Sequence, residues 1–298
     1  MGRALIAPVD KNISATRGTV ASFRPEPGPK AGGDAIAAYK HDGVICLRGA
    51  FERDWLDVIE AGIKLFYAEE PARESAKNVV VEREGDDGSF RYATMMWKTL
   101  EPFRRVIFES HAPDLFGSLL ETRQLNLYYD FLLIKQPGCR SAVTPWHQDH
   151  SYYCLNGTKI INCWIALDTI PTETALRFVQ GSHLGGQIYR TVHFDPSKQY
   201  AGTMTERPLP PDFDNDPEAE ILSCAMEPGD ALVWNSRTIH SAPGNRLNRR
   251  RAALSLNFAG DDVTYFGIPQ EPDPPVRGEG LVEGDPITCE TFPLLRSS

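Results

Sequence analysis

The feature that most restricts the fold is a series of short apolar runs in the second half of the chain. Most of these runs, between about residues 121 and 262, are bounded by Gly, Pro, Asn or Asp, and they read LNLYYDFLLIKQPG, KIINCWIALDTI, ALRFVQGS, ILSCAMEPGDALVWN and RAALSLNFAG. Apolar runs of this length with turn residues at their ends are typical of antiparallel β-strands. We therefore expect a β core over about 121–262.

The residues before this core show helical patterns instead. A short helix is expected from Asp34 to Gly43, and a longer one is indicated by apolar residues at helical spacing, namely Trp55, Leu56, Ile59, Ile63 and Phe66. A further helix is expected over about 101–120, whereas residues 1–33 have no periodicity and predict an irregular arm. The fold class is therefore mainly β with flanking helices, and residues 1–298 are expected to form a single domain.

Composition argues against two classes of partner. The formal net charge is -9, and the only basic run is 249–251, whereas a nucleic-acid-binding protein usually presents a basic patch. No apolar run approaches the roughly 18 residues that span a bilayer, so no membrane contact is expected. The N-terminus lacks the apolar stretch of a secretory signal, and the six cysteines form no C-x-x-C pair. Reduced thiols and a cytoplasmic location are therefore expected.

The segment TPWHQDHSYY carries the strongest candidate for chemistry. His147 and Asp149 are two residues apart, so on an extended strand both side chains point to the same face. A third ligand can come from the distant segment WNSRTIHSAPGN, which offers His240. Two imidazoles and one carboxylate form the facial triad that binds Fe(II) and leaves positions open for a co-substrate and O2. A zinc ion in a hydrolytic site of the same three donors remains a chemical alternative.

An arginine downstream of His240 suits a dicarboxylate co-substrate. 2-Oxoglutarate has a free C5 carboxylate, which a guanidinium group binds well with two parallel hydrogen bonds. Strand alternation in RAALSLNFAG puts one set of residues on a small, polar face and Leu254, Leu256 and Phe258 on the other; the polar set is Arg251, Ala253, Ser255 and Asn257. This pattern favours Arg251 as the carboxylate partner, and the alternative is a run of solvated arginines after a loop.

Several motifs together resemble the phytanoyl-CoA dioxygenase family in their order and spacing: HQDHSYY, INCWIALD, ALRFVQGSH, EPGDALVWNSRTIHSAPGN and RRAALSLNF. The resemblance extends from about residue 34 to residue 262. It implies a double-stranded β-helix (jelly-roll, cupin-like) core with helices on one side. It also implies Fe(II), 2-oxoglutarate and O2 as reactants, with succinate and CO2 as products.

The resemblance assigns roles by position. His147, Asp149 and His240 match the iron ligands, Arg251 matches the arginine that holds the C5 carboxylate, and Trp164 matches an aromatic residue of the co-substrate pocket. The intact carboxylate favours hydroxylation or desaturation over halogenation, because related halogenases have Gly or Ala at the position of Asp149. The sequence departs from the family pattern two residues after His240, where a small hydroxyl residue is common and this chain has Ala242, preceded by Ser241.

Four further residues are weaker candidates. Lys135 is a candidate partner for a co-substrate carboxylate, although a strand lysine can also extend its amine to solvent. Leu132 is a candidate co-substrate contact. Tyr153 and Trp97 are candidate substrate contacts, although aromatic residues near a β core more often only pack. His150 has the opposite strand parity to His147 and is expected to point away from the metal.

The sequence therefore predicts an Fe(II)- and 2-oxoglutarate-dependent dioxygenase that hydroxylates or desaturates a small-molecule metabolite. The alternatives are a cupin-like metalloenzyme, such as an isomerase or hydrolase, that does not use 2-oxoglutarate, and a non-enzymatic β-sandwich binding module. The polar, Pro-rich segment 184–220 is expected to be a lid over the substrate. The substrate and the oligomeric state are left open.

Overall fold

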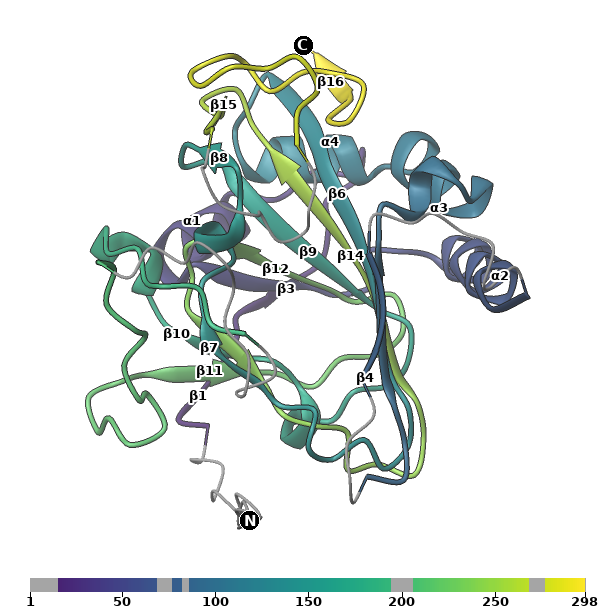
Figure 1. The fold of residues 1–298 in the computed structure, drawn as a ribbon, viewed down its shortest axis with the longest axis vertical. Helices are drawn as coiled ribbons and strands as arrows, with labels where there is room; N and C mark the ends of the chain where they lie inside the picture. Colours follow the sequence, from purple (N-terminus) through teal and green to yellow (C-terminus); the bar gives the residue numbers. More distant parts are fainter. Residues whose placement is uncertain (1–15, 69–76, 82–85, 194–205, 268–276, 298) are drawn as a thin grey trace, which may run out of the picture.

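Two β-sheets form the centre of the computed structural model, which describes residues 16–68, 77–81, 86–193, 206–267 and 277–297 (Figure 1). Within these residues the larger sheet has nine strands, in the order β2 (Ser22–Phe23), β3 (Val44–Leu47), β12 (Ala231–Asn235), β9 (Ile160–Ala166), β14 (Arg251–Ala259), β6 (Gln124–Lys135), β5 (Phe90–Thr94) and β4 (Lys77–Val81), with β16 (Leu294–Ser297) also paired to β6. The smaller sheet has the order β1 (Gly18–Thr19), β11 (Ile221–Ser223), β10 (Arg177–Val179), β13 (His240–Ala242) and β7 (Thr144–His147). A two-stranded sheet pairs β15 (Thr264–Tyr265) with β8 (Leu155–Asn156).

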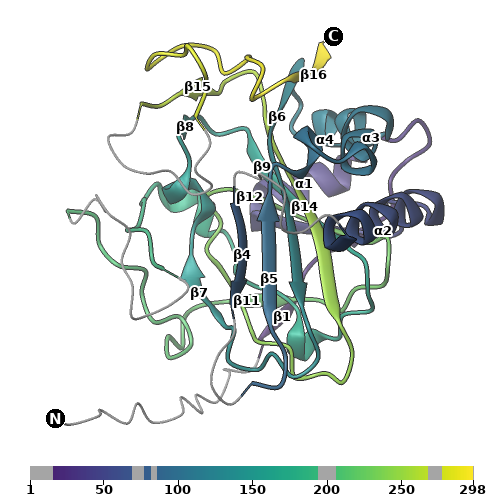
Figure 2. The same ribbon diagram turned by 45° about the vertical axis from the view of Figure 1, so that its right-hand side comes forward.

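Helices cover the face of the larger sheet that is turned away from the smaller sheet, as Figure 2 shows for α2, α3 and α4. The described α-helices are α1 (Gly33–Asp42), α2 (Arg53–Ala68), α3 (Glu101–Glu109) and α4 (Ala112–Leu119). Short 3-10 helices are η1 (Met96–Lys98), η2 (Asp149–Tyr152), η3 (Thr172–Thr174) and η4 (Ser182–Gly185). In the described part of the chain, no helix is long and apolar enough to cross a membrane.

Strand β14 has the two-faced pattern that its alternation predicted. Leu254, Leu256 and Phe258 are buried in the cluster that includes the helices, and the Phe258 ring stacks on Phe116 of α4 at 5.3 Å. Ala253 lies on the other face, in a cluster to which both sheets contribute. Because hydrophobic burial holds each face against its own neighbours, the strand links the helical layer to the space between the sheets.

One expected helix is in fact two. The interval 101–120 is interrupted at Ser110, whose backbone is extended, with ψ at 171°. The Ser110 hydroxyl accepts a hydrogen bond from the backbone N–H of Ala112, and Pro113 lies in the first turn of α4. A proline favours a helix start but disrupts a helix interior, so the chain begins a new helix at this point.

Two regions expected to be irregular are more ordered than predicted where they are described. Strands β1 and β2 lie within the arm 1–33 and add in parallel to β11 and β3, with Val20 between them almost fully buried. In the expected lid 184–220, Phe213 packs edge-on against Trp146 at 5.7 Å, on the outer face of the smaller sheet. Residues 194–205 of this segment, and residues 1–15 of the arm, lie outside the described part. The function of the segment as a lid stays a prediction.

Candidate metal centre

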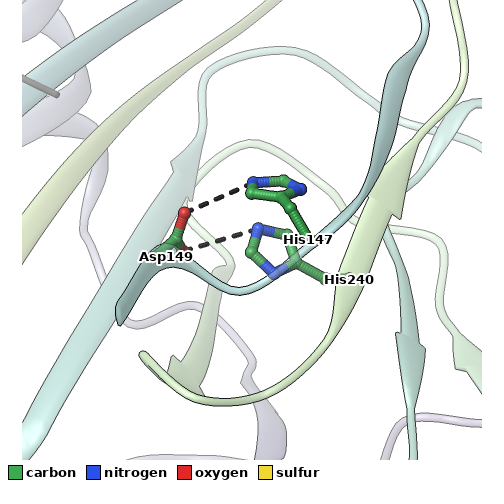
Figure 3. Close-up of side chains that lie close together, drawn as sticks. All are labelled: His147, Asp149 and His240. Atoms are coloured by element: carbon green, nitrogen blue, oxygen red, sulfur yellow. Dashed lines mark ion pairs between the residues drawn. The ribbon is translucent and has the colours of Figure 1, made fainter. Parts of the chain in front are cut away.

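The side chains of His147 and Asp149 meet that of His240, which is distant in the sequence, as Figure 3 shows. His147 ends β7, and it lies directly opposite His240 of β13 in their antiparallel pairing. Nε2 of His147 is 3.4 Å from Oδ1 of Asp149, and Nε2 of His240 is 3.4 Å from Oδ2. One ligand atom from each residue lies within 4.8 Å of the other two. These distances suit three donors arranged around a single ion.

Asp149 reaches the site in a different way from the one expected. The strand ends at His147, Gln148 is extended with φ at -115°, and Asp149 begins the 3-10 helix η2. The carboxylate is therefore presented by a turn and not by a continuing strand. His150 follows in the same helix, and its Nδ1 lies 3.2 Å from the hydroxyl of Ser236.

Backbone carbonyl groups fix the orientation of both imidazoles. Nδ1 of His147 donates to the carbonyl of Pro145 at 2.8 Å, and Nδ1 of His240 donates to the carbonyl of Thr238 at 3.0 Å. Each bond places the proton on Nδ1 and leaves the lone pair on Nε2, which faces the carboxylate. Metal-binding histidines are commonly oriented by such a bond on the second nitrogen.

The Asp149 carboxylate is held by two residues of the larger sheet. Nε1 of Trp234 donates to Oδ2 at 3.0 Å, and the side-chain amide of Asn162 donates to the same oxygen. The Tyr153 hydroxyl donates to Oδ1 of Asn162 at 3.0 Å and lies 3.1 Å from the hydroxyl of Tyr129. This chain of bonds limits the rotation of the carboxylate, so its position is set before any ion binds.

The protonation states suit metal binding at neutral pH. Burial acts to raise the pKa of the Asp149 carboxyl, but His240, His147 and the Trp234 hydrogen bond outweigh it, so the pKa is lowered overall. Burial lowers the pKa of His240 to about 4, against the opposing effect of the carboxylate. A carboxylate and neutral imidazole are the forms that bind a metal. The donor set therefore fits the Fe(II) facial triad predicted from the sequence.

Arg251 and Lys135 form a buried pair of basic side chains on neighbouring strands of the larger sheet. They lie opposite each other in the β14–β6 pairing, with exposed fractions of 5% and 2%. Both donate to the carbonyl of Pro243 at 3.1 Å, and Lys135 also donates to the carbonyl of Ala142 at 2.6 Å. Lys135 therefore does not extend to solvent. Burial lowers the pKa of Arg251 to about 10, so the guanidinium remains charged at neutral pH.

The charge of Arg251 is not neutralised by an acid among the described residues, where it donates only to backbone carbonyls. Its neighbour Arg250, by contrast, forms ion pairs with Glu60 and, at 3.0 Å, with Asp168. The Arg251 guanidinium carbon lies 5.7 Å from the ring centre of Trp164. Trp164 is two residues from Asn162 on β9, so both side chains are on the face of the sheet that carries the Asp149 contacts.

The structure separates the weaker candidates. Leu132 pairs with Leu254 and is buried among the helices, so it is on the opposite face from Lys135 and Arg251. Trp97 is also on the helix-covered side, where its ring lies 5.8 Å from that of Phe108 in α3. The expected contacts of Leu132 with the co-substrate and of Trp97 with the substrate do not agree with these positions. Neither assignment took account of the face of the sheet on which the side chain lies.

Two details near His240 bear on the departure from the family pattern. The Ser241 hydroxyl accepts a hydrogen bond from Nε of Arg177 at 3.1 Å, on the face opposite to His240. Ala242 faces the space between the sheets and pairs directly with Thr144 of β7. A hydroxyl group is therefore close to Ala242, but it comes from the neighbouring strand. Sequence reasoning missed Trp234 as a partner of Asp149 and Thr144 as the partner of Ala242, because both contacts depend on the fold and not on a local pattern.

A separate cavity of about 660 Å³ opens beside β1 and β11, at the edge of the smaller sheet. Its described lining includes Arg17, Arg48 and Cys224 and contains none of the three candidate ligands. Arg48 is paired with Asp230 at 2.7 Å, and Arg17 donates to backbone carbonyls. The cationic side chains of this cavity are therefore already engaged.

Comparisons with known proteins agree with this geometry. The probable phytanoyl-CoA dioxygenase of Caenorhabditis elegans is 29% identical over 162 residues, which cover 51% of this chain and 49% of that protein. The alignments with three curated relatives span about half of each relative's length, from 49% to 53%.

Two solved structures share the fold. The non-haem α-ketoglutarate-dependent carbocyclase SnoK from nogalamycin biosynthesis has a TM-score of 0.69 at 21% identity, covering 91% of this chain and 99% of that one. The epimerase SnoN, in complex with Fe3+, α-ketoglutarate and nogalamycin RO, has a TM-score of 0.68 at 23% identity, covering 88% of this chain and 98% of that one. The prediction of a mainly β, double-stranded β-helix core with flanking helices is confirmed. The family model described as phytanoyl-CoA dioxygenase (PhyH) matches residues 39–253, and the chain therefore belongs to the phytanoyl-CoA dioxygenase family.

Proposed function

We propose that the chain is an Fe(II)- and 2-oxoglutarate-dependent dioxygenase that hydroxylates or desaturates a small-molecule metabolite. The observation that carries the proposal is the combination of the His147, Asp149 and His240 cluster with a buried guanidinium, that of Arg251, which lacks an acidic partner among the described residues. A hydrolytic metal site needs the three-ligand cluster but not the buried guanidinium. An isolated buried cation is unfavourable unless an anion binds to it.

The three ligands would hold Fe(II) through two Nε2 atoms and one carboxylate oxygen. When bound, iron and 2-oxoglutarate supply the oxidation of a C–H bond by O2, with release of succinate and CO2. The chain's own contribution is orientation: backbone carbonyls aim the imidazoles, and Trp234 and Asn162 fix the Asp149 carboxylate. The retained carboxylate supports hydroxylation or desaturation and not halogenation, because no coordination position is freed for a halide.

Arg251 would bind the C5 carboxylate of 2-oxoglutarate, with Lys135 adding positive charge from the neighbouring strand. Trp164 would form the wall between Arg251 and the metal side of the site, since its ring contacts the guanidinium. Thr144, opposite Ala242, would supply the hydroxyl that the family often has two residues after the distal histidine. Leu132 is not included, because its side chain is on the helix-covered face.

For the substrate side, Tyr153 is the one sequence candidate that is also close to the ligands, through Asn162. We propose a small molecule and O2 as reactants, no nucleic-acid partner, and a single oxygenase domain over residues 1–298. We also propose a cytoplasmic location. The six cysteines all lie in the described residues and form no disulfide there, which supports the proposal because a reducing compartment keeps thiols reduced.

The test is whether the purified chain consumes O2 and forms succinate from 2-oxoglutarate in the presence of Fe(II). Many such reactions proceed slowly without substrate, so a substrate screen can follow. Asp149→Ala is the matched control, and it is expected to abolish succinate formation by removing one ligand. Wild-type protein that binds Fe(II) but forms no succinate, with or without a library of candidate metabolites, would contradict the proposal and favour a metalloenzyme that uses no 2-oxoglutarate.

A further inference from the structure

Residues 187–193 run alongside the turn that carries the carboxylate ligand. Gln148, which is 2% exposed, donates from Nε2 to the carbonyl of Gln187 at 3.0 Å and accepts from the N–H of Tyr189 at 3.0 Å. The same Nε2 donates to the carbonyl of Arg237 at 2.9 Å, in the loop that leads into β13. One buried amide therefore joins the segment to both ligand-bearing stretches of the chain.

Tyr152 makes a second attachment on the other side of Asp149. Its hydroxyl donates to the carbonyl of Val192 at 2.7 Å and accepts from the N–H of the same residue at 2.9 Å. Its ring also meets the His147 ring edge-on, at 5.8 Å between centres. Gln148 and Tyr152 thus flank the carboxylate ligand in sequence, and each binds one end of the segment.

The segment has other contacts as well, since Tyr189 packs against a cluster that contains Trp146 and Phe213. It belongs to no strand or helix, and its side chains are mostly half-buried. Arg190 bonds to the carbonyls of Pro208 and Arg207, which belong to another irregular stretch. A segment without a strand ladder keeps its conformation only through such individual bonds. Gln148 and Tyr152 supply the bonds that join this segment directly to the ligand turn.

We propose that Gln148 and Tyr152 are positioning residues that couple the order of residues 187–193 to the metal-ligand turn. The inference rests on the proposed function in one respect, namely that the triad is the iron site. Coupling between two sites is reciprocal: if an ordered segment tightens the binding of the ion, the ion must order the segment by the same factor. Neither side chain touches the ion or the co-substrate in this account.

The experiment follows hydrogen exchange of the Tyr189 and Val192 amides in the full chain, with and without Fe(II), under anaerobic conditions. Both N–H groups donate to the proposed positioning residues, so their exchange reports on these bonds directly. We expect Fe(II) to slow their exchange about fivefold or more, the lower end of typical coupling between sites. The amide of Met226, bonded to Ile170 away from the site, is expected to be unaffected.

Two variants remove the bonds while keeping side-chain size. Tyr152→Phe retains the ring against His147, and Gln148→Met retains the length of the side chain. In both, we expect the effect of Fe(II) on the two amides to be lost and the Kd for Fe(II) to rise by a matching factor. Tyr265→Phe is the control, because Tyr265 is a buried tyrosine of β15 and is expected to behave as wild type.

The outcomes distinguish this inference from the proposed function. If Fe(II) binds but leaves the wild-type amides unchanged, or if Tyr152→Phe responds like wild type, the coupling is refuted, whatever the enzymatic activity. If exchange slows as expected but no succinate forms from 2-oxoglutarate, the coupling stands and the proposed reaction fails. Wild-type protein that binds no Fe(II) would overturn both.

Discussion

Replacing Arg251 by Met separates the binding role of this residue from its structural role. In the unliganded protein, the guanidinium makes two hydrogen bonds to carbonyls, worth about 1.5 kcal/mol each. The fall of its pKa to about 10 corresponds to a burial penalty of about 3 kcal/mol for the charge. These two contributions nearly cancel, and Pro243 keeps a donor in Lys135. We therefore expect Arg251→Met to change the free energy of unfolding by no more than about 1 kcal/mol.

The same substitution should strongly weaken the binding of 2-oxoglutarate. A paired, charge-assisted contact contributes about 3 kcal/mol, which corresponds to roughly a 100-fold rise in Kd. The assay is an anaerobic titration of the Fe(II)-loaded protein with 2-oxoglutarate, followed by the weak visible charge-transfer band of the chelate. Fe(II) affinity measured without 2-oxoglutarate should not change.

Arg250→Met is the matched control, one residue away. Arg250 is paired with Glu60 and Asp168, so its loss should lower stability while leaving the Kd for 2-oxoglutarate within about threefold of wild type. The reasoning would be refuted if Arg251→Met kept a Kd within about threefold of wild type, or if both variants weakened binding equally.

Three more predictions follow from the contacts around the site. Trp234→Phe removes the donor to Oδ2 of Asp149 and should raise the Kd for Fe(II) about 10- to 100-fold in a competition titration; an unchanged Kd would contradict the positioning role. Burial, together with Arg237 and Arg207, lowers the pKa of His150 to about 3, below its unfolded value near 6.5. The folded state therefore keeps its full stability above about pH 6.5 and loses stability as the pH falls toward 3, because only the unfolded chain binds the proton in that range. Between pH 7 and 4.5, urea unfolding of His150→Gln should therefore lose about 2–3 kcal/mol less than wild type, and parallel losses would contradict this. Trp97→Phe should leave the Kd values for Fe(II) and 2-oxoglutarate unchanged, because the Trp97 ring is on the helix-covered side. A higher Kd for either ligand would contradict this placement and indicate that Trp97 contributes to the site.

Periodicity predicted the parts of the fold that depend on local pattern. The two faces of β14 follow from alternation alone, because successive side chains of a strand point to opposite faces of the sheet. The convergence of His147 and His240 required one further assumption, that their strands pair. Asp149 was placed near them for a partly wrong reason, since a 3-10 turn and not a strand presents it.

The missed features are those that depend on strand pairing or on a change of chain direction. Asn162 and Trp234 meet Asp149 because they are direct partners in the β9–β12 pairing, which no local pattern reveals. The placement of Leu132 could have been corrected from the sequence, because Leu132 and Lys135 are three apart and cannot share a face of a regular strand. Trp97 follows Met95, whose φ is 60°, so the strand parity of β5 does not extend to it.

The alternation of β14 also has a consequence for how its variants will behave as a group. Substitutions at even-numbered positions from 252 to 258 meet the apolar layer and should change the unfolding temperature. Substitutions at odd-numbered positions from 251 to 257 meet the interior between the sheets, so they should change ligand affinity as well as the unfolding temperature. A lineage can therefore adjust its thermal tolerance through the even-numbered positions of this strand without changing the residues that face the ligand site.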